Sequence, residues 1–479
     1  MGFTQGVSGL NAAASGLDTI GNNIANSQTV GFKTGRSEFA DLYAGAKTGL
    51  GVQVSGITQS FEGGPLSTTG RSLDLAIDGG GFFRLQDGNQ TVYSRDGQFQ
   101  QTRDGNIANG QGALLTGYNV TNFNDPNAAP RINAGGNPGA IQLPAEGLNA
   151  RATTDASLQA SLDAGAEIIG DTFDSNDSST YNWSTPSTVF DSLGNAHSIN
   201  LYFTKTGENQ WAVNGEMPLS EESSLPRTVT SGAAYPGTFD PTTSGNGVTR
   251  DISVTTNGTD HLYTAVVSGA TADAGGTFSG GQIRYVEQLP ESTMAFDANG
   301  NLTMVSPATG TKADDLPDSA VAFNLDAANG SAPIDFTYDF AGTAQTAQSF
   351  AAGNPAQDGY ASGSLTGIAI QSDGMIRGNY SNGQSLNLAQ VALASFRNEQ
   401  GLSPAGGNAW TETADSGQPA LGTAGVGQLG NLLGGTLEGS NVDLSQQLVD
   451  MIVAQRNYQA NAQTIKTQDQ VLQTAVNLR

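Results

Sequence analysis

The side chains that most often do chemistry in proteins are scarce in this chain of 479 residues. It contains no cysteine, which excludes a thiol nucleophile, a zinc ribbon and a disulfide framework. There are two histidines, His197 and His261. They are too few to favour a histidine-based metal site or triad, and an ordinary place in a sheet or loop is the better interpretation.

Two glycine-containing segments match phosphate-binding loops only in part. Lys47-Thr48 resembles the end of a P-loop, but Ala46 stands where that loop has glycine and Asp41 where its first glycine belongs. Gly79-Gly80-Gly81 leads into Phe82-Phe83, which is a strand pattern, whereas a dinucleotide-binding loop opens a helix. We interpret the glycines as a tight crossing of strands where only glycine fits.

The acidic residues offer no clear catalytic arrangement. Asp174, Asn176 and Asp177 could hold calcium weakly, but their spacing is not that of an EF-hand, and an acidic turn in water is favoured. The other carboxylates are scattered, so no pair stands out as general acid and base. We therefore expect no enzymatic activity, no metal site and no cofactor.

The net charge of −25 is distributed unevenly along the chain. The first 32 residues carry one charged side chain, Asp18, and residues 441–479 carry equal numbers of acidic and basic groups. Uncharged ends can pack against copies of themselves without repulsion, while an acidic middle stays hydrated. An acidic protein of this kind is not expected to bind nucleic acid.

Both ends show apolar residues at alternating spacings of three and four, which predicts helices that pack along a coiled-coil-like seam. We take these residues as the candidate self-assembly surface. They are Phe3, Val7, Leu10, Leu17, Ile20 and Ile24 at the start, and Leu444, Leu448, Met451, Tyr458, Ile465, Leu472 and Val476 at the end.

The two predicted helices differ in length, at ~35 Å for the first and ~55 Å for the second. Ser440 and Asp443 resemble a capping box at the start of the second helix. Because the shorter helix cannot cover the longer one, part of the C-terminal apolar face needs partners on other chains. The alternative is that the two helices pair only with each other, as a local hairpin.

Between the helices the patterns are mainly those of short strands. A helical piece around Ser37–Tyr43 is expected before a strand at Val52–Ile57. Farther on, Asp-Gly and Asn-Gly pairs predict hairpin turns at residues 87–88, 96–97, 104–105, 109–110, 373–374 and 382–383. Two β blocks of similar character flank the middle, so the chain path looks nested.

The sequence thus predicts a multidomain, mainly β protein with α-helical N- and C-termini. The expected parts are a helical inner core domain (1–32 and 440–479), a connector (33–70), an inner β domain (71–145 and 358–439) and one or more outer β domains (146–357). Within the last, the Ser-, Thr- and Gly-rich residues 216–281 are expected to be an insertion or an extra subdomain.

Several segments together resemble the axial proteins of the bacterial flagellar rod and hook. They cover roughly residues 1–120 and 360–479. The long middle favours the hook members over the shorter rod proteins, and Thr188–His197 and Phe296–Leu302 resemble parts of the hook's outer domain. The other matching segments are Asn22–Asn26, Val30–Lys33, Leu75–Phe83, Tyr93–Phe99, Asp104–Asn106, Leu115–Tyr118, Glu438–Leu444, Met451-Ile452 and Gln455–Asn461.

The resemblance implies a subunit of a helical homopolymer, the bendable tube that acts as a universal joint and carries torque from rod to filament. It implies that the terminal helices line the channel. The implied partners are the flagellar rod, the hook cap, the hook-filament junction proteins and the flagellar type III export apparatus.

The same resemblance predicts an extracellular protein exported without a cleaved signal peptide. The first lysine is Lys33, so the basic start of a signal peptide is missing, and no run approaches the ~20 apolar residues of a membrane span. Within the family, a distal rod or hook-associated protein is the nearest alternative. From another class, a secreted β-rich adhesin would share the acidic body, but it would not need helical seams at both ends.

Overall fold

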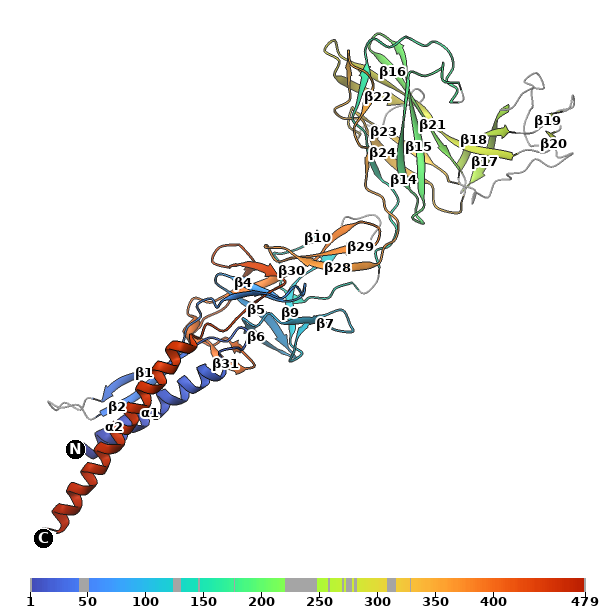
Figure 1. Cartoon of the computed structure of the whole chain (residues 1–479). Helices are drawn as coiled ribbons and strands as arrows, with labels where there is room; N and C mark the ends of the chain where they lie inside the picture. Colours follow the sequence, from blue (N-terminus) through green and yellow to red (C-terminus); the bar gives the residue numbers. More distant parts are fainter. Residues whose placement is uncertain are drawn as a thin grey trace. The chain divides into compact units, whose positions relative to one another are not determined.

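The computed structural model in Figure 1 has one long helix at each end of the chain and strands between them. This confirms the prediction of a mainly β protein with helical termini. The chain divides into unit 1, residues 1–147 and 365–479, and unit 2, residues 148–364. The structure describes residues 2–42, 51–123, 131–144, 147–175, 177–219, 248–256, 259–268, 271–272, 278–279, 282–307, 316–327 and 329–477.

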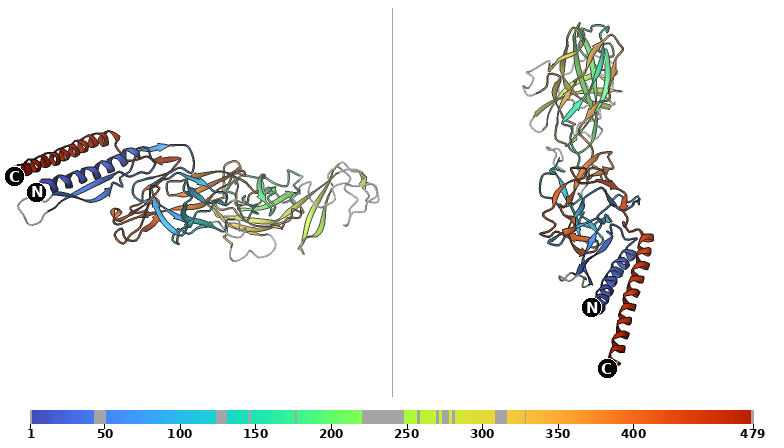
Figure 2. Two further views of the ribbon diagram at one scale, coloured as in Figure 1. Left: turned by 90° about the horizontal axis from the view of Figure 1, so that it is seen from below. Right: turned by 90° about the vertical axis from the view of Figure 1, so that its left-hand side faces the viewer.

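In unit 1 the two helices, α1 (Gly2–Ala25) and α2 (Leu444–Asn477), lie side by side (Figure 2). Asp443 starts α2, because its Oδ1 accepts hydrogen bonds from the amides of Ser445 (2.9 Å) and Gln446 (3.1 Å). The predicted capping box at Ser440 is therefore wrong. The helix begins after Asp443, which is itself the cap, while the Ser440 hydroxyl accepts a bond from the amide of Val442.

The segment after α1 is a hairpin of β1 (Gly35–Leu42) and β2 (Gly51–Gln59). The predicted helical piece at Ser37–Tyr43 is wrong over residues 37–42, and Tyr43 lies outside the described residues. Pairing with β2 satisfies the backbone of β1, and a side-chain hydrogen bond of 2.7 Å joins Ser37 to Thr19 of α1. These contacts outweigh a weak local helical preference.

The main sheet of unit 1 interleaves strands from both sequence blocks, in the order β28-β29-β30-β9-β5-β6-β32-β31. Their bounds are β28 Leu365–Ile370, β29 Met375–Tyr380, β30 Ser385–Ser395, β9 Leu114–Thr121, β5 Phe82–Asp87, β6 Gln90–Ser94, β32 Ala409–Thr411 and β31 Ser403–Gly406. Edge-to-face contacts among Phe61, Phe82, Tyr93, Phe396 and Trp410 fill the core beneath β5 and β6.

Shorter strands complete unit 1. Two of the pairs, β3–β35 and β4–β34, join the N-terminal block to the segment just before α2. The bounds are β3 Leu66–Thr68, β4 Leu75–Asp78, β7 Phe99–Gln101, β8 Ile107–Asn109, β10 Arg131–Ile132, β11 Gly139–Ala140, β33 Ala420–Thr423, β34 Asn431–Gly434, β35 Thr436–Glu438 and the 3₁₀ helix η1 Glu399–Gly401.

Most of the predicted hairpin turns connect paired strands, as at Asp104-Gly105 between β7 and β8. The exception is Asp96-Gly97, because β6 pairs with β5 and β32 and not with β7. Gly97 is needed for a close approach instead, since a Cβ atom there would lie 1.7 Å from the Leu75 carbonyl oxygen. The tight crossing at Gly79–Gly81 is confirmed, and the Gly80 carbonyl accepts a 2.8 Å bond from the Gly430 amide.

Unit 2 is built on a seven-stranded sheet in the order β14-β15-β16-β21-β18-β17, with β22 also on β21. Trp211, Phe203 and Phe340 are fully buried in its core. Turns at Gly194-Asn195 and Asn299-Gly300 join β14 to β15 and β21 to β22. The bounds are β14 Trp183–Phe190, β15 Ala196–Gly207, β16 Gln210–Pro218, β17 Val248–Thr256, β18 Thr259–Ser268, β21 Gln282–Phe296 and β22 Leu302–Pro307.

The Ser-, Thr- and Gly-rich segment 216–281 falls largely outside the described residues, and its described strands β17 and β18 continue the seven-stranded sheet from β21. Small sheets complete the unit. They are formed by β12 Asp155–Ser157, β13 Ala160–Asp163, β19 Thr271–Ala272, β20 Phe278–Ser279, β23 Ala320–Leu325, β24 Ile334–Asp339, β25 Ala344–Thr346, β26 Ala351–Ala352 and β27 Ala356–Gln357.

Candidate assembly surface

The α1–α2 contact depends on small residues of α1. A Cβ atom added at Gly9 would lie 2.9–3.0 Å from the side-chain amide of Asn461, and one at Gly6 would lie 3.0 Å from Ile465 Cγ1. Glycine therefore lets the two helix backbones approach closely, at the usual cost of glycine in a helix interior.

The β1–β2 hairpin packs on α1, so α1 has contacts from two elements. Asn23, which is 1% exposed, ties the three elements together. Its amide nitrogen donates to the Gly35 carbonyl (2.8 Å) and to Gln447 Oε1 (3.0 Å), and its Oδ1 accepts from the Gly35 amide (3.0 Å). The end of α1, the start of β1 and the first turn of α2 are thus held by one buried side chain.

The predicted seam residues of α1 differ in how exposed they are. Phe3 is 48% exposed, while the other five are half-buried against α2 and the hairpin: Val7, Leu10, Leu17, Ile20 and Ile24. The helix pair thus covers most of the N-terminal stripe.

On α2 the predicted stripe and the half-buried stripe coincide only in part. Met451 and Ile465 are half-buried, whereas Leu444, Leu448, Tyr458 and Leu472 are 37–56% exposed. Val476 lies in α2, and its side chain is outside the described residues. Apart from Met451 and Ile465, the half-buried residues of α2 are polar or small: Gln447, Asp450, Ala454, Asn461, Ala462 and Gln468.

The exposed apolar residues of α2 are concentrated in its first turns. Leu444, Leu448, Val449, Ile452 and Val453 are between 42% and 55% exposed. Isolated exposed apolar residues are normal on proteins, but a contiguous group of this size marks an interaction surface. We call these five residues the α2 apolar patch.

A buried ion cluster lies where both helices meet the β strands of unit 1. Glu438 Oε1 is 2.6 Å from Lys33 Nζ, and Glu438 Oε2 is 3.2 Å from Arg95 Nη1. All three side chains are at most 2% exposed. Lys33 also donates to the Glu62 carbonyl (2.6 Å), and Arg95 donates to the Gly79 carbonyl (2.9 Å). We call Lys33, Arg95 and Glu438 the ion cluster.

Electrostatics at the cluster reflect its burial. Burial lowers the pKa of Lys33, and the hydrogen bond and negative charge of Glu438 oppose that effect. The positive charge of Arg95 lowers the pKa further, while the more distant Glu399 raises it. The charged form of Lys33 therefore depends on Glu438.

Asn441 forms a second link between the chain ends. Its Oδ1 accepts hydrogen bonds from the Thr34 amide (2.8 Å) and hydroxyl (2.7 Å). Its amide nitrogen donates to the carbonyls of Ser60 (2.9 Å) and Glu62 (3.1 Å). Both the oxygen and the nitrogen of its side-chain amide therefore bind the segment after α1 to the segment before α2.

Sequence reasoning did not assign roles to Asn23, Lys33, Arg95, Glu438 or Asn441. Each lies in a segment that resembles the flagellar axial proteins, so the signal was present but did not distinguish these positions. One further clue was available, since Lys33 is the first basic residue after a stretch with a single charge.

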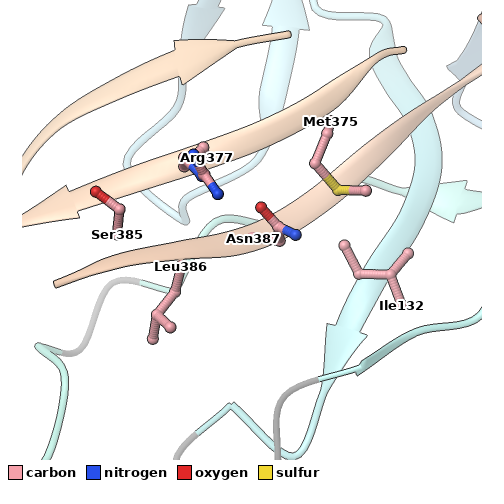
Figure 3. Close-up of a pocket in the computed structure, with 6 residues that line it drawn as sticks. All are labelled: Ile132, Met375, Arg377, Ser385, Leu386 and Asn387. Carbon is pink, nitrogen blue, oxygen red and sulfur yellow. The ribbon is translucent and has the colours of Figure 1, made fainter. Parts of the chain in front are cut away.

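An open depression of about 320 Å³ lies on unit 1 over β29, β30 and β10. Figure 3 shows six of the side chains that line it. Its lining is mixed: Ile132, Met375 and Leu386 are apolar, and Arg377 carries the charge. A depression of about 450 Å³ in unit 2 includes Asp155, Asp339 and Asp358. Asp358 Oδ2 is 3.1 Å from Arg151 Nη2, so one of these carboxylates is neutralised.

Within the described residues, no three His, Asp or Glu side chains come together as metal ligands. None of the helices in that part of the chain has the length and apolar character to cross a membrane. His197 is an ordinary buried residue, with Nε2 2.9 Å from Asp191 Oδ2.

Comparisons with known proteins match four families to successive parts of the chain. "Flagella basal body rod protein" matches residues 4–33, and "Flagellar hook protein FlgE/F/G D1 domain" matches residues 76–159. "Flagellar basal body protein FlaE D2 domain" matches residues 148–360, and "Flagellar basal body rod FlgEFG protein C-terminal" matches residues 433–478.

The chain is 42% identical to the flagellar hook protein FlgE of Escherichia coli (strain K12) and to that of Salmonella typhimurium, with 100% of each chain covered. It is 30% identical to the flagellar hook protein FlgE of Rhizobium meliloti, over 99% of this chain and 98% of the relative. The crystal structure of Helicobacter pylori flagellar hook protein FlgE2 aligns with a TM-score of 0.43 and 12% identity, covering 76% of this chain and 98% of that one.

Proposed function

Because the chain belongs to the flagellar hook protein FlgE family and is a structural subunit of the bacterial flagellar hook, we propose that its α1, its α2 and the β1–β2 hairpin form the surface on which copies polymerise. The family is a structural one whose members are not known as enzymes. Membership implies self-polymerisation into the hook and association with other flagellar proteins.

The observation that carries the proposal is the α2 apolar patch. Five apolar side chains remain 42–55% exposed although α1 is already packed along α2. In water this exposure is unfavourable, and a second copy of the chain removes it by burying the patch. The ends carry little net charge, so packed copies do not repel each other there.

In this arrangement the paired helices form the inner core of a tube and have a coiled-coil-like seam between subunits. The strand pairs β3–β35 and β4–β34, together with the interleaved sheet of unit 1, support a nested chain path with residues 71–145 and 358–439 as an inner β domain. Residues 33–70 connect the core to it. Residues 146–357 are the outer part, with 216–281 as an insertion in it.

The tube works as a universal joint because its layers contact each other differently. Helices packed along ridges and grooves keep the axis continuous while tolerating small shifts. The acidic outer residues contact one another through small polar groups and water, so they slide when the tube bends. Torque from the motor then passes from rod to filament through a bent hook.

The partners follow from the same position in the flagellum. We propose that the subunit meets the rod at one end of the hook and the junction proteins at the other, that it polymerises beneath the hook cap, and that the flagellar export apparatus delivers it to the cell exterior without a cleaved signal peptide. An exported chain must be unfolded and then fold at the tip, which suits ends that gain stability from packing.

Electron microscopy of the purified protein tests the proposal. At raised protein concentration, the hook function predicts short tubes that are curved or that bend. Straight rigid rods, or the absence of any polymer, would contradict the proposed assembly.

A further inference from the structure

The ion cluster joins residues from opposite ends of the chain. Glu438 is 405 residues from Lys33 and 343 residues from Arg95. Both cations belong to the N-terminal part of unit 1, and the anion lies at the end of β35, just before α2. The cluster is therefore complete only when the two ends of the chain have met.

Without Glu438 the site holds two cations whose other hydrogen-bond acceptors are neutral. Lys33 Nζ would keep the Glu62 carbonyl, and Arg95 would keep the carbonyls of Ile77 and Gly79. Burying an ion without its partner costs far more than a broken hydrogen bond between neutral groups. Unit 1 cannot bury Lys33 and Arg95 at low cost before Glu438 arrives.

The same residue fixes the place where the helices leave the β strands. The Glu438 carbonyl accepts a 2.8 Å hydrogen bond from the Gly31 amide, close to the end of α1. Glu438 Oε1 accepts a 2.8 Å bond from the Gly64 amide, and the Gly439 amide donates to the Pro65 carbonyl (2.8 Å). Glu438 therefore both neutralises the two buried cations and fixes the position of the helix ends.

We infer that Glu438 is a positioning residue for self-assembly. By neutralising Lys33 and Arg95, it makes docking of the C-terminal segment a condition for folding unit 1. Only chains whose two ends have met then present the paired helices to a neighbouring copy. This rests on the proposed role of the helix pair in polymerisation. The inference adds that assembly depends on a chain whose N- and C-terminal segments have docked on each other.

Native-state hydrogen exchange on the full chain measures the coupling. The amides of Gly31, Gly64 and Gly439 report docking of the C-terminal segment, and the amides of β5 report unit 1. In the wild type both sets should open together, with protection equal within about threefold. If the docking amides exchange more than about tenfold faster than β5, the ends undock without unfolding unit 1 and the inference fails.

Two variants separate charge from shape. Glu438→Gln keeps the size but leaves two buried cations, so the equilibrium constant for unfolding should rise on the order of 100- to 1,000-fold. The triple variant K33M/R95M/E438L replaces the cluster by apolar side chains, so β5 should recover protection to within about tenfold of wild type. In the triple variant the docking amides should exchange at least about tenfold faster than β5, because undocking no longer strands a charge.

A pH profile identifies the charge as the cause. Lys33 faces Glu438, Arg95 and the more distant Glu399. Removing Glu438 lowers the pKa of Lys33 further, so alkaline pH should neutralise Lys33 and stabilise the Glu438→Gln variant. Near pH 10 the ratio of its unfolding equilibrium constant to that of the wild type should shrink by about tenfold. A deficit that is the same at pH 7 and pH 10 would contradict the role of charge.

Polymerisation then tests the link to assembly, with Glu412→Gln as control. Glu412 is a carboxylate of the same unit that accepts a hydrogen bond from Tyr93 OH (2.9 Å), and it is not in the ion cluster. The triple variant should need at least about tenfold more protein to form tubes, whereas Glu412→Gln should assemble like wild type. If the triple variant assembles at the wild-type concentration, the inference is wrong while the hook function stands. If the wild type forms no tubes, the hook function itself fails.

Discussion

Replacing Leu448 by aspartate should block polymerisation without unfolding the monomer. Leu448 lies on α2 within the α2 apolar patch and is 42% exposed. The residues of α2 that are half-buried beside α1 lie at other positions, among them Met451 and Ala454. We therefore expect the α1–α2 contact and the melting of unit 1 to change by less than about 0.5 kcal/mol.

The size of the effect follows from the area that remains to be buried. Fully burying a leucine side chain contributes about 1.5–3 kcal/mol, so burying the exposed 42% of Leu448 contributes about 0.6–1.3 kcal/mol per subunit. Leu448→Ala should then raise the critical concentration for assembly roughly three- to ninefold. Leu448→Asp adds the cost of burying an unpaired charge, which brings the increase above roughly 100-fold.

Sedimentation of tubes across a protein concentration series measures the critical concentration directly. Leu193→Asp is the matched control, because Leu193 is an exposed leucine (59%) of unit 2 and the change adds the same charge outside the helices. The control should assemble like wild type. Tubes of Leu448→Asp at the wild-type concentration, or equal loss of assembly in the control, would refute the reasoning.

Three further predictions test other parts of the structure. Gly9→Val should separate α1 from α2, because its side chain meets the Asn461 amide, and circular dichroism should show lost helix with the β melting unchanged. Burial tends to raise the pKa of Asp191, but hydrogen bonds from His197 and Asn329 outweigh this effect and lower the pKa to about 2 from 3.8. Unit 2 should therefore lose about 2 kcal/mol of stability as the pH falls from about 4 to 2. Urea titration should show a smaller loss of stability over this pH range in the Asp191→Asn variant. Because the chain carries a charge of −25, tubes should form at lower protein concentration in about 0.5 M NaCl than in low salt. Light scattering measures the onset of tube formation, and an onset that does not depend on salt would contradict this prediction.

The parts of the fold that were predictable depend on local signals. Apolar spacing marked both terminal helices, and turns such as Asp104-Gly105 and Asn382-Gly383 could be located because glycine with a φ of 81° at the second position closes a hairpin. The same local logic failed at Asp96-Gly97, where the glycine serves a close approach to Leu75 and not a turn. A dipeptide does not reveal which strand its neighbours will join.

The parts that were not predictable depend on residues far apart in sequence or on polar contacts. No periodicity links Lys33 to Glu438, 405 residues away, so a buried ion pair between them leaves no local signal. The helix contact at Gly9 and Asn461 uses a small residue and an amide, which a hydrophobic pattern cannot identify. On α1 the apolar spacing picked out mostly half-buried residues, whereas on α2 it picked out mostly exposed ones such as Leu444 and Leu448.

The central claim is that the exposed face of α2 becomes buried between copies of the chain. Because the protein has no cysteine, a single Leu448→Cys variant can be labelled at one position only. Maleimide labelling of this variant should be at least about tenfold slower in assembled tubes than in the monomer, since Leu448 is 42% exposed before assembly. Equal labelling rates in monomer and tube would contradict the account.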